Sequence, residues 1–404
     1  MDLDHRYPAL ADLKARARRR LPHFVWEYLD SATGSESVRH LNRAALDARR
    51  LTPAVLGGPV DPDLATPLLG ATHSAPFGIA PVGMSGLIWP GAEAALARLG
   101  AARRIPYGLS TVATRLPEEI GPLAHDMGWF QLYAPGDPAI RADLVARARA
   151  SGFRVLVLTV DVPAPSRRER QRRADLTIPP KKTPRMIWQA ATHPAWALGT
   201  LRHGIPRLRL MDGYLQLDRN APSTAHAGSL LRTNPDWAYV RALREMWPGP
   251  LVLKGILRPD DAARAVAEGA DAVWVSNHAG RQFDGCPATI DVLPTIRRAV
   301  PDAALIVDGG VETGLDILRM IAAGADFVML GRAWHYALAA LGPVGAAHLD
   351  HVLRADLVAN LHQLGLNRPA ELRQNQNGQD EDDQQHSGPR DTSVHPGRNP
   401  LRSG

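Results

Sequence analysis

The chain is poor in cysteine, in aromatic residues and in long apolar stretches without interruption. Cys286 is the only cysteine, so a disulfide framework and a metal site built on several thiolates are both excluded. The longest uncharged stretch, 74–92, is long enough to span a membrane, but Pro76, Pro81 and Pro90 interrupt it and favour a core strand with its loop. The N-terminus mixes charges of both signs and has no apolar segment typical of a secretory signal. We therefore expect a cytoplasmic protein with no integral membrane segment.

Acidic residues are also in deficit, since 47 Lys and Arg face 41 Asp and Glu and the isoelectric point is near 9.7. The excess is local: segment 167–209 contains eleven Lys and Arg but only two acids. No zinc-finger spacing, recognition helix or aromatic-interleaved RNA motif accompanies it, so we expect no nucleic-acid partner. Two interpretations of this segment stay open. In the first, the segment and its Trp188 and Trp196 bind peripherally to the anionic inner face of the membrane, where the enzyme reaches a quinone. In the second, the segment forms a mobile lid over the site.

Eight short apolar runs are present, and their near-continuous apolarity is typical of strands covered on both faces. The eight runs are Phe77–Ala80, Tyr107–Ser110, Trp129–Leu132, Val155–Val160, Leu251–Lys254, Ala272–Ser276, Ala304–Val307 and Phe327–Leu330. Helical stretches lie between them. One begins at Pro259 and ends at Gly269, and another covers 313–323.

This alternation predicts an α/β fold, a closed (β/α)8 TIM barrel. A doubly wound sheet is the alternative, but the first strand lacks the Gly-x-Gly-x-x-Gly turn that such a sheet uses to bind dinucleotides. We predict one domain over 1–372, with a long connection at 163–249 after the fourth strand. The polar segment 373–404 cannot bury a core, and we expect it to be disordered.

Polar residues follow nearly every predicted strand, at the end where barrels place their active residues. They are Ser110, Gln131, Tyr133, Thr159, Asp161, Lys254, Ser276, Asp308 and Arg332. Glycines accompany the last two strand ends, as Asp308-Gly309-Gly310 and Gly331-Arg332. Barrels commonly bind phosphate there, because glycine lets the backbone approach an anion closely.

The loop after the sixth strand places an imidazole and a guanidinium three residues apart, at His278 and Arg281. Histidine can accept and return a proton near neutral pH, and arginine can hold a carboxylate through two hydrogen bonds. This loop therefore offers a base and a carboxylate anchor at the mouth of the barrel.

The segment Ser276-Asn277-His278-Ala279-Gly280-Arg281-Gln282-Phe283-Asp284-Gly285 resembles a signature of the FMN-dependent α-hydroxy-acid oxidase/dehydrogenase family. The resemblance covers about 13–371 and includes Phe130-Gln131-Leu132-Tyr133 and Leu158-Thr159-Val160-Asp161. The Trp188–Pro194 and Lys254–Leu257 segments look most like the family's bacterial L-lactate and mandelate dehydrogenases.

The resemblance implies an FMN-dependent L-2-hydroxy-acid dehydrogenase that forms a homotetramer. It favours a dehydrogenase over an oxidase. His278 would be the catalytic base, Asp161 would hydrogen-bond it, and Tyr133 would bond the substrate hydroxyl. Arg168, Arg281 and Tyr28 would bind the carboxylate. The residues implied to contact FMN are Pro81, Val82, Ser110, Gln131, Thr159, Lys254, Ser276, Asp308, Gly309, Gly310, Gly331 and Arg332. Its electron acceptor would be a quinone or another redox carrier.

Several positions depart from the family pattern. Ala279 stands where the signature usually has glycine, and Glu312 stands where the family usually has an arginine that reaches the FMN phosphate. A carboxylate repels a phosphate, so Arg332 and backbone donors would have to compensate. Val82 replaces a common threonine, and Gly83 matches the dehydrogenase-like members. Two alternatives therefore stay open: an FMN barrel of another reaction class, such as an isomerase, or an FMN-binding protein with impaired activity.

Overall fold

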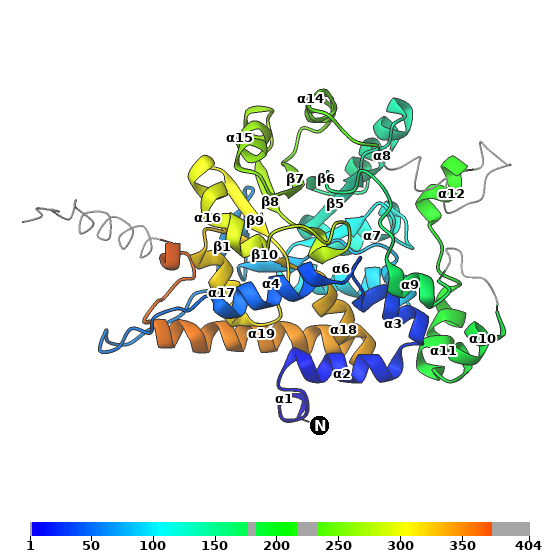
Figure 1. Cartoon of the computed structure of the whole chain (residues 1–404), viewed down its shortest axis with the longest axis horizontal. Coiled ribbons are helices and arrows are strands. Elements are labelled where there is room, and N and C mark those ends of the chain that lie inside the picture. The colour runs from blue at the N-terminus through cyan, green and yellow to red at the C-terminus, as the bar shows by residue number, and fades with distance from the viewer. Residues whose placement is uncertain (1, 177–182, 216–232, 374–404) are drawn as a thin grey trace, which may run out of the picture.

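The computed structural model describes residues 2–176, 183–215 and 233–373 (Figure 1). Eight parallel strands form a closed barrel in the order β10-β3-β4-β5-β6-β7-β8-β9. They are β3 (Phe77–Ile79), β4 (Tyr107–Ser110), β5 (Gly128–Tyr133), β6 (Val155–Thr159), β7 (Leu251–Ile256), β8 (Ala272–Val275), β9 (Ala304–Val307) and β10 (Phe327–Leu330). The predicted TIM barrel is confirmed, and each predicted strand matches an observed one to within two residues.

The strands are almost completely buried because helices cover their outer faces and side chains fill the barrel. The interior is filled by large residues from facing strands. Trp129 and Trp274 meet there edge to face, with ring centroids 6.5 Å apart. A two-stranded hairpin, β1 (Thr66–Leu68) and β2 (Ala71–His73), closes the end at which the strands begin. Its Leu68 packs into this interior cluster.

Helices follow the strands and form the outer layer (Figure 1). They are α6 (Ala92–Arg103), α7 (Pro117–Ala124), α8 (Pro138–Ala150), α14 (Trp237–Met246), α15 (Pro259–Ala267), α16 (Thr289–Ala299), α17 (Gly314–Ala322), α18 (Arg332–Leu341) and α19 (Pro343–Leu364). The helix starts follow simple chemistry. Pro259 opens α15 as predicted, and α17 begins with a capping box in which Thr313 and Asp316 satisfy each other's backbone N–H groups.

Four helices precede the barrel: α1 (Leu3–Arg6), α2 (Leu10–Arg20), α3 (His23–Asp30) and α4 (Ser37–Ala48). α2 packs on α18, whereas α4 packs against the loop after β8 and against α16 and α17. The N-terminal helices therefore lie at the end of the barrel where the strands finish. A short helix, α5 (Ser85–Ile88), follows β3 at that same end and contacts α3.

The long connection after β6 contains α9 (Glu169–Arg173), α10 (Pro184–Ala191), α11 (Pro194–His203) and α12 (Arg209–Leu215). Trp196 of α11 is buried, not exposed as a surface-anchoring residue would be. Its ring lies edge to face with Phe24, and its Nε1 donates to the carbonyl of Leu87 at 2.9 Å. Trp188, in contrast, is 70% exposed. The predicted disordered tail covers 373–404, but residue 373 is helical, and 374–404 lie outside the described part.

Candidate active site

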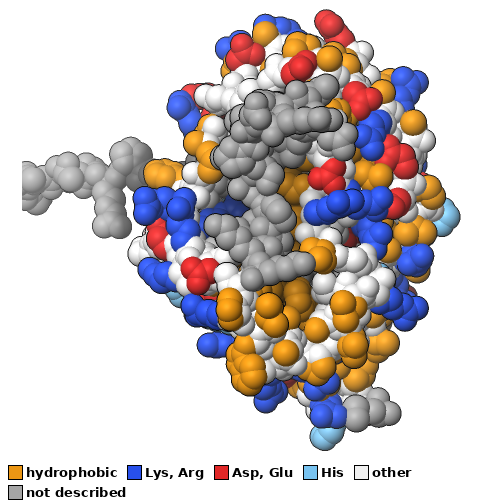
Figure 2. Space-filling model, turned by 90° about the vertical axis from the view of Figure 1, so that its right-hand side faces the viewer, with side chains coloured by type: hydrophobic (Ala, Val, Ile, Leu, Met, Phe, Trp, Pro, Cys, Tyr) orange, Lys and Arg blue, Asp and Glu red, His pale blue; other side chains and the backbone are white. Residues whose placement is uncertain are grey.

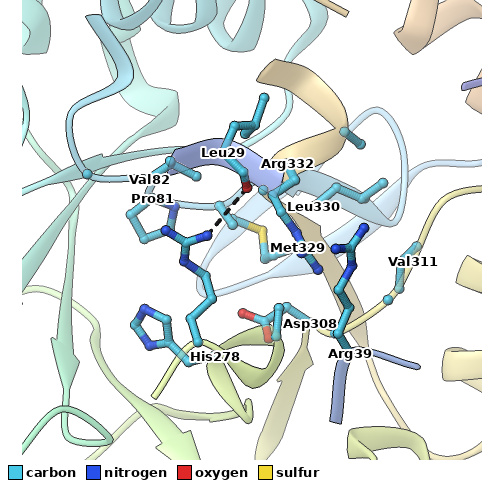
Figure 3. Close-up of a pocket in the computed structure, with 18 of the residues that line it drawn as sticks. Leu29, Arg39, Pro81, Val82, His278, Asp308, Val311, Met329, Leu330 and Arg332 are labelled. Carbon is cyan, nitrogen blue, oxygen red and sulfur yellow. Dashed lines mark hydrogen bonds between the residues drawn. The ribbon is translucent and has the colours of Figure 1, made fainter. Parts of the chain in front are cut away.

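A cavity of about 420 Å³ lies at the carboxyl end of the barrel strands. That volume is in the range of pockets that bind a small molecule or cofactor. Its lining includes most of the predicted site residues, namely Tyr28, Pro81, Val82, Gln131, Tyr133, Thr159, Arg168, Lys254, His278, Arg281, Asp308, Gly309, Gly310, Gly331 and Arg332. Figure 3 shows His278 and Asp308 on one side of it, opposite Pro81 and Val82.

The imidazole of His278 is fixed by Asp161. Its Nδ1 lies 3.1 and 3.2 Å from the two carboxylate oxygens, and both side chains are largely buried. Burial lowers the pKa of His278, and Asp161 opposes that shift without cancelling it. Burial raises the pKa of Asp161, but attraction to His278 and Lys254 outweighs burial and holds it below its usual value. The pair therefore favours a neutral imidazole beside an ionised carboxylate.

Two guanidinium groups accompany this imidazole in the cavity lining. Arg281 donates to the backbone carbonyls of Tyr28 and Ser31 at 3.0 and 2.7 Å, at the end of α3. Burial lowers the pKa of Arg281 to about 9, and repulsion from Arg168 adds to that shift. Arg168 donates through Nε to Ser166. Two like charges held close together in a partly buried space are stabilised by an anion between them.

Lys254 has a carboxylate partner that strand-end reasoning did not anticipate. Its Nζ lies 2.7 Å from Ser276 Oγ and 3.2 Å from Asp308, and Ser276 donates in turn to Asp308 at 2.7 Å. Burial lowers the pKa of Lys254, but attraction to Asp308 and Asp161 reverses this and raises it. Lys254 is therefore a buried cation. The carboxylate of Asp308 forms an ion pair with it and would not face a bound anion.

Among the buried side-chain atoms of the described residues that have no hydrogen-bond partner are Gln131 Nε2 and Thr159 Oγ1. Both residues line the cavity. A buried donor or acceptor without a partner costs about 1–3 kcal/mol, so such atoms are usually completed by a ligand. Gln131 is oriented for this role because its Oε1 accepts from Ser110 at 2.8 Å.

Three predicted residues stand one layer behind the cavity wall. Ser110 orients Gln131, Asp161 orients His278, and Ser276 links Lys254 to Asp308. The structure also adds residues from the N-terminal helices that sequence reasoning missed, namely Lys14, Arg39, His40 and Arg43. Nothing in the local sequence marks them, because they follow no strand.

The match to known proteins covers nearly the whole of this arrangement. A family model described as FMN-dependent dehydrogenase matches residues 17–377. The chain belongs to this family. Its members include an L-lactate dehydrogenase of Stenotrophomonas maltophilia, 39% identical over 90% of this chain and 97% of that protein. An L-lactate dehydrogenase of Pseudomonas aeruginosa is also 39% identical, over 86% of this chain and 92% of that one.

Solved structures of the family have the same fold. The monotopic membrane protein (S)-mandelate dehydrogenase superposes with a TM-score of 0.83 and 31% identity, over 90% of this chain and 97% of that one. A mandelate oxidase variant with (S)-mandelic acid gives 0.76 and 31%, over 91% and 97%. Members of the FMN-dependent dehydrogenase family use FMN, and FMN is the cofactor of this enzyme.

The residues present fit this cofactor. Gln131 Nε2 and Thr159 Oγ1 offer hydrogen bonds to a polar ring edge, and Lys254 offers a buried positive charge. Gly309 and Gly310 line the cavity with φ of +118° and +79°, a backbone region that suits glycine. Ala279 also lies in this region, at φ +52°, where the family usually has glycine, so its backbone is strained.

Proposed function

We propose that this enzyme oxidises a small L-2-hydroxy acid, lactate- or mandelate-like, to the 2-keto acid. The observation behind the proposal is the joint placement of His278, Arg168 and Arg281 in the wall of one cavity. These groups match what a 2-hydroxy acid presents, a carboxylate and a proton that must be removed. The names of the L-lactate and mandelate relatives support the same substrate class.

In the proposed mechanism, Arg168 and Arg281 hold the substrate carboxylate, assisted by Tyr28. Tyr133 bonds the hydroxyl and positions it toward the imidazole. Because Asp161 accepts from Nδ1, Nε2 of His278 bears the lone pair and takes up the proton that the substrate releases. Asp161 then stabilises the imidazolium. Bound FMN supplies the acceptor for the remaining hydrogen and electron pair, which no side chain could accept.

We assign the cofactor-binding role to the rest of the lining. With FMN bound, Pro81 and Val82 would contact the ring, and Gln131, oriented by Ser110, and Thr159 would offer it hydrogen bonds. Lys254, held by Ser276 and Asp308, stabilises the extra negative charge of the reduced ring. Gly309, Gly310, Gly331 and Arg332 bind the phosphate through backbone N–H groups and a guanidinium.

Anaerobic reduction of the holoenzyme tests this reaction. We expect L-lactate or L-mandelate to bleach the visible absorbance of the bound flavin, and the D-enantiomer to leave it unchanged. The His278→Gln variant should retain its flavin, but its rate of bleaching should fall by at least about a thousandfold, because a general base that also orients the substrate is removed. The matched control is His351→Gln, an exposed histidine that pairs with Asp4 far along the chain. Bleaching by the His278→Gln variant at an unchanged rate would exclude His278 as the base.

We further propose that the enzyme docks peripherally on an anionic phospholipid surface and passes its electrons to a membrane quinone. Large apolar side chains on α10, α11 and the turn after α11 are exposed, namely Ile187, Trp188, Leu198, Leu201 and Ile205. Figure 2 shows hydrophobic side chains gathered at the lower end of this face. Exposed Arg202 and Arg207 belong to the same surface. The buried Trp196 fixes α11 to the body of the protein, which favours a rigid docking face over a lid.

The described helices include none long and apolar enough to cross a membrane. The combination of apolar and basic groups is suited instead to the interface of an anionic bilayer. The monotopic membrane character of the similar (S)-mandelate dehydrogenase supports this assignment.

Sedimentation with phosphatidylcholine vesicles, with and without phosphatidylglycerol, tests the docking face. We expect binding to the anionic vesicles and a loss of about tenfold or more for the double variant Trp188→Ser/Leu201→Ser. The matched control is Val55→Ser/Leu56→Ser, which removes from a different loop two apolar side chains that are at least as exposed. Equal binding by all three proteins would refute the docking face. The predicted homotetramer is tested separately by sedimentation velocity.

A further inference from the structure

At the end of the cavity that we assign to the FMN phosphate, this chain has a carboxylate where the family pattern has a cation. Glu312 lines the cavity beside Gly310 and Val311, at the position where the family pattern has arginine. A phosphate monoester has a charge of about −1.5 to −2 at neutral pH, so a carboxylate facing it is unfavourable. If FMN binds tightly, other cations have to supply the missing charge.

Helix α4 lies directly against this loop. A Cβ atom on Gly310 would be 3.1 Å from the Cβ of Asn42 and 3.2 Å from its carbonyl carbon, so the two backbones touch. Arg39 stands one helical turn before Asn42 and therefore lies over the same loop. Arg39 lines the cavity, and Figure 3 shows its guanidinium beside that of Arg332, between Val311 and Leu330.

The neighbouring Arg43 is unsuited to the role. It donates to Asp316 at 2.6 Å through both terminal nitrogens and to Asp47 at 2.7 and 3.0 Å. Arg319 shares the same two carboxylates, so two cations balance two anions here, and the contact of Arg43 with the carbonyl of Gly310 serves to fix the loop. Arg43 orients the site without adding positive charge to it.

Arg39 belongs to a cluster with a surplus of positive charge. It donates to Asp30 at 3.0 Å and to Glu36 at 3.0 Å, but Arg170 also binds these two carboxylates and Glu27. Lys14 lies 3.6 Å from Asp30, and Arg332 donates to the Asp30 carbonyl at 3.5 Å. Three cations, Lys14, Arg39 and Arg170, therefore share three carboxylates, and Arg332 adds a fourth positive charge at the backbone carbonyl of Asp30. Of the four, Lys14, Arg39 and Arg332 line the cavity and Arg170 does not.

We propose that Arg39 and Lys14, from the N-terminal helices, supply the positive charge at the FMN phosphate that position 312 does not provide. Together with Arg332 they form a cation set that approaches the phosphate from α2, α4 and α18, while Glu312 weakens the binding. The proposal rests on FMN as the cofactor and not on the hydroxy-acid reaction. It assigns to this chain a phosphate site built from residues that follow no barrel strand.

Flavin titration of the full-length chain, stripped of FMN and shown to reload, tests this site without any substrate. FMN and riboflavin differ only in the phosphate. The dissociation constant of riboflavin divided by that of FMN therefore isolates the contribution of the phosphate. We expect Arg39→Met to reduce that ratio about tenfold or more and to leave the riboflavin constant within twofold. Arg49→Met is the matched control, since Arg49 ends the same helix and pairs with Asp291 outside the cavity.

Two further variants keep the test decisive if Arg39→Met fails to fold. Lys14→Met disturbs the carboxylate cluster less, because Lys14 makes only a 3.6 Å contact with it, and should lower the ratio severalfold. Arg39→Met/Glu312→Arg returns the cation to the loop and should restore the ratio. The proposal is overturned if Arg39→Met and Lys14→Met both keep the wild-type ratio. Loss of riboflavin and FMN binding in equal measure would also overturn it, by showing a structural role.

Discussion

Replacing Asp161 with asparagine would keep the shape of the catalytic pair and remove its charge. The imidazole nitrogen and the carboxylate oxygen are 3.1 Å apart. With an effective dielectric constant of about 20, an imidazolium at that distance gains about 5 kcal/mol from the carboxylate. The asparagine amide would return about 1 kcal/mol through a neutral hydrogen bond. We therefore expect flavin reduction to slow by about a hundredfold to a thousandfold, since each factor of ten is about 1.4 kcal/mol.

The pH dependence gives this prediction a second readout. The base must be neutral to accept a proton, so kcat/KM falls as the pH drops through the pKa of His278 in the free enzyme. Burial places that pKa below its ordinary value even with Asp161 opposing the shift. Without the carboxylate the pKa falls further, so the acid limb of the profile should move to lower pH while the plateau drops.

Anaerobic stopped-flow measurements of flavin reduction across pH would record both effects. Asp291→Asn, in an exposed pair with Arg49, is the matched control and should change neither. The reasoning is refuted if Asp161→Asn keeps a plateau within threefold of the wild-type value, or if its acid limb moves to higher pH.

Three further predictions concern stability and cofactor retention. Lys254→Met leaves the carboxylate of Asp308 buried without its cation and should lower the free energy of unfolding by about 3–5 kcal/mol, measured by chemical denaturation of the holoenzyme. An unchanged value would contradict the buried ion pair. Ala279→Gly relieves a φ of +52° and should raise the free energy of unfolding by about 1 kcal/mol or less, because the entropy of glycine offsets part of the gain; a small rise in melting temperature would record it. A fall in melting temperature would contradict strain at this position. Gln131→Leu removes the buried Nε2 that has no partner, but it also removes the acceptor of Ser110, so the melting temperature of the flavin-free protein should change little. The melting temperature of the holoenzyme should fall because flavin binding weakens, and an equal shift in both forms would rule out a bond to the flavin.

The barrel could be predicted because its physics is local. Buried parallel strands need unbroken apolar runs, and helices between them need caps such as Pro259, so periodicity alone locates both. The strand ends then locate His278, Lys254 and their neighbours, since a parallel barrel brings all such ends to one mouth.

What could not be predicted depends on tertiary docking. Arg39 and Lys14 reach the cavity only because α2 and α4 fold back over the barrel mouth, and no local pattern specifies that return. Trp196 illustrates the same difficulty in reverse. Its basic, aromatic surroundings indicate a surface residue, but Phe24, far away in the sequence, buries it. The partner of Lys254 also escaped prediction, because Lys254 lies on β7 and Asp308 follows β9, and they meet only across β8 in the folded barrel.

The amide pair between Asn42 and Asn277 has a consequence for how the protein matures. Each side chain donates to the other, at 3.0 and 2.8 Å, across 235 residues of sequence. Arg43 and Asp316 meet across 273. During synthesis α4 emerges early, but the surfaces that it packs on, the loop after β8 and helices α16 and α17, follow the sixth and seventh barrel strands. Contacts between such remote segments form slowly. We therefore expect the flavin pocket to be completed late in folding, after most of the chain has been synthesised.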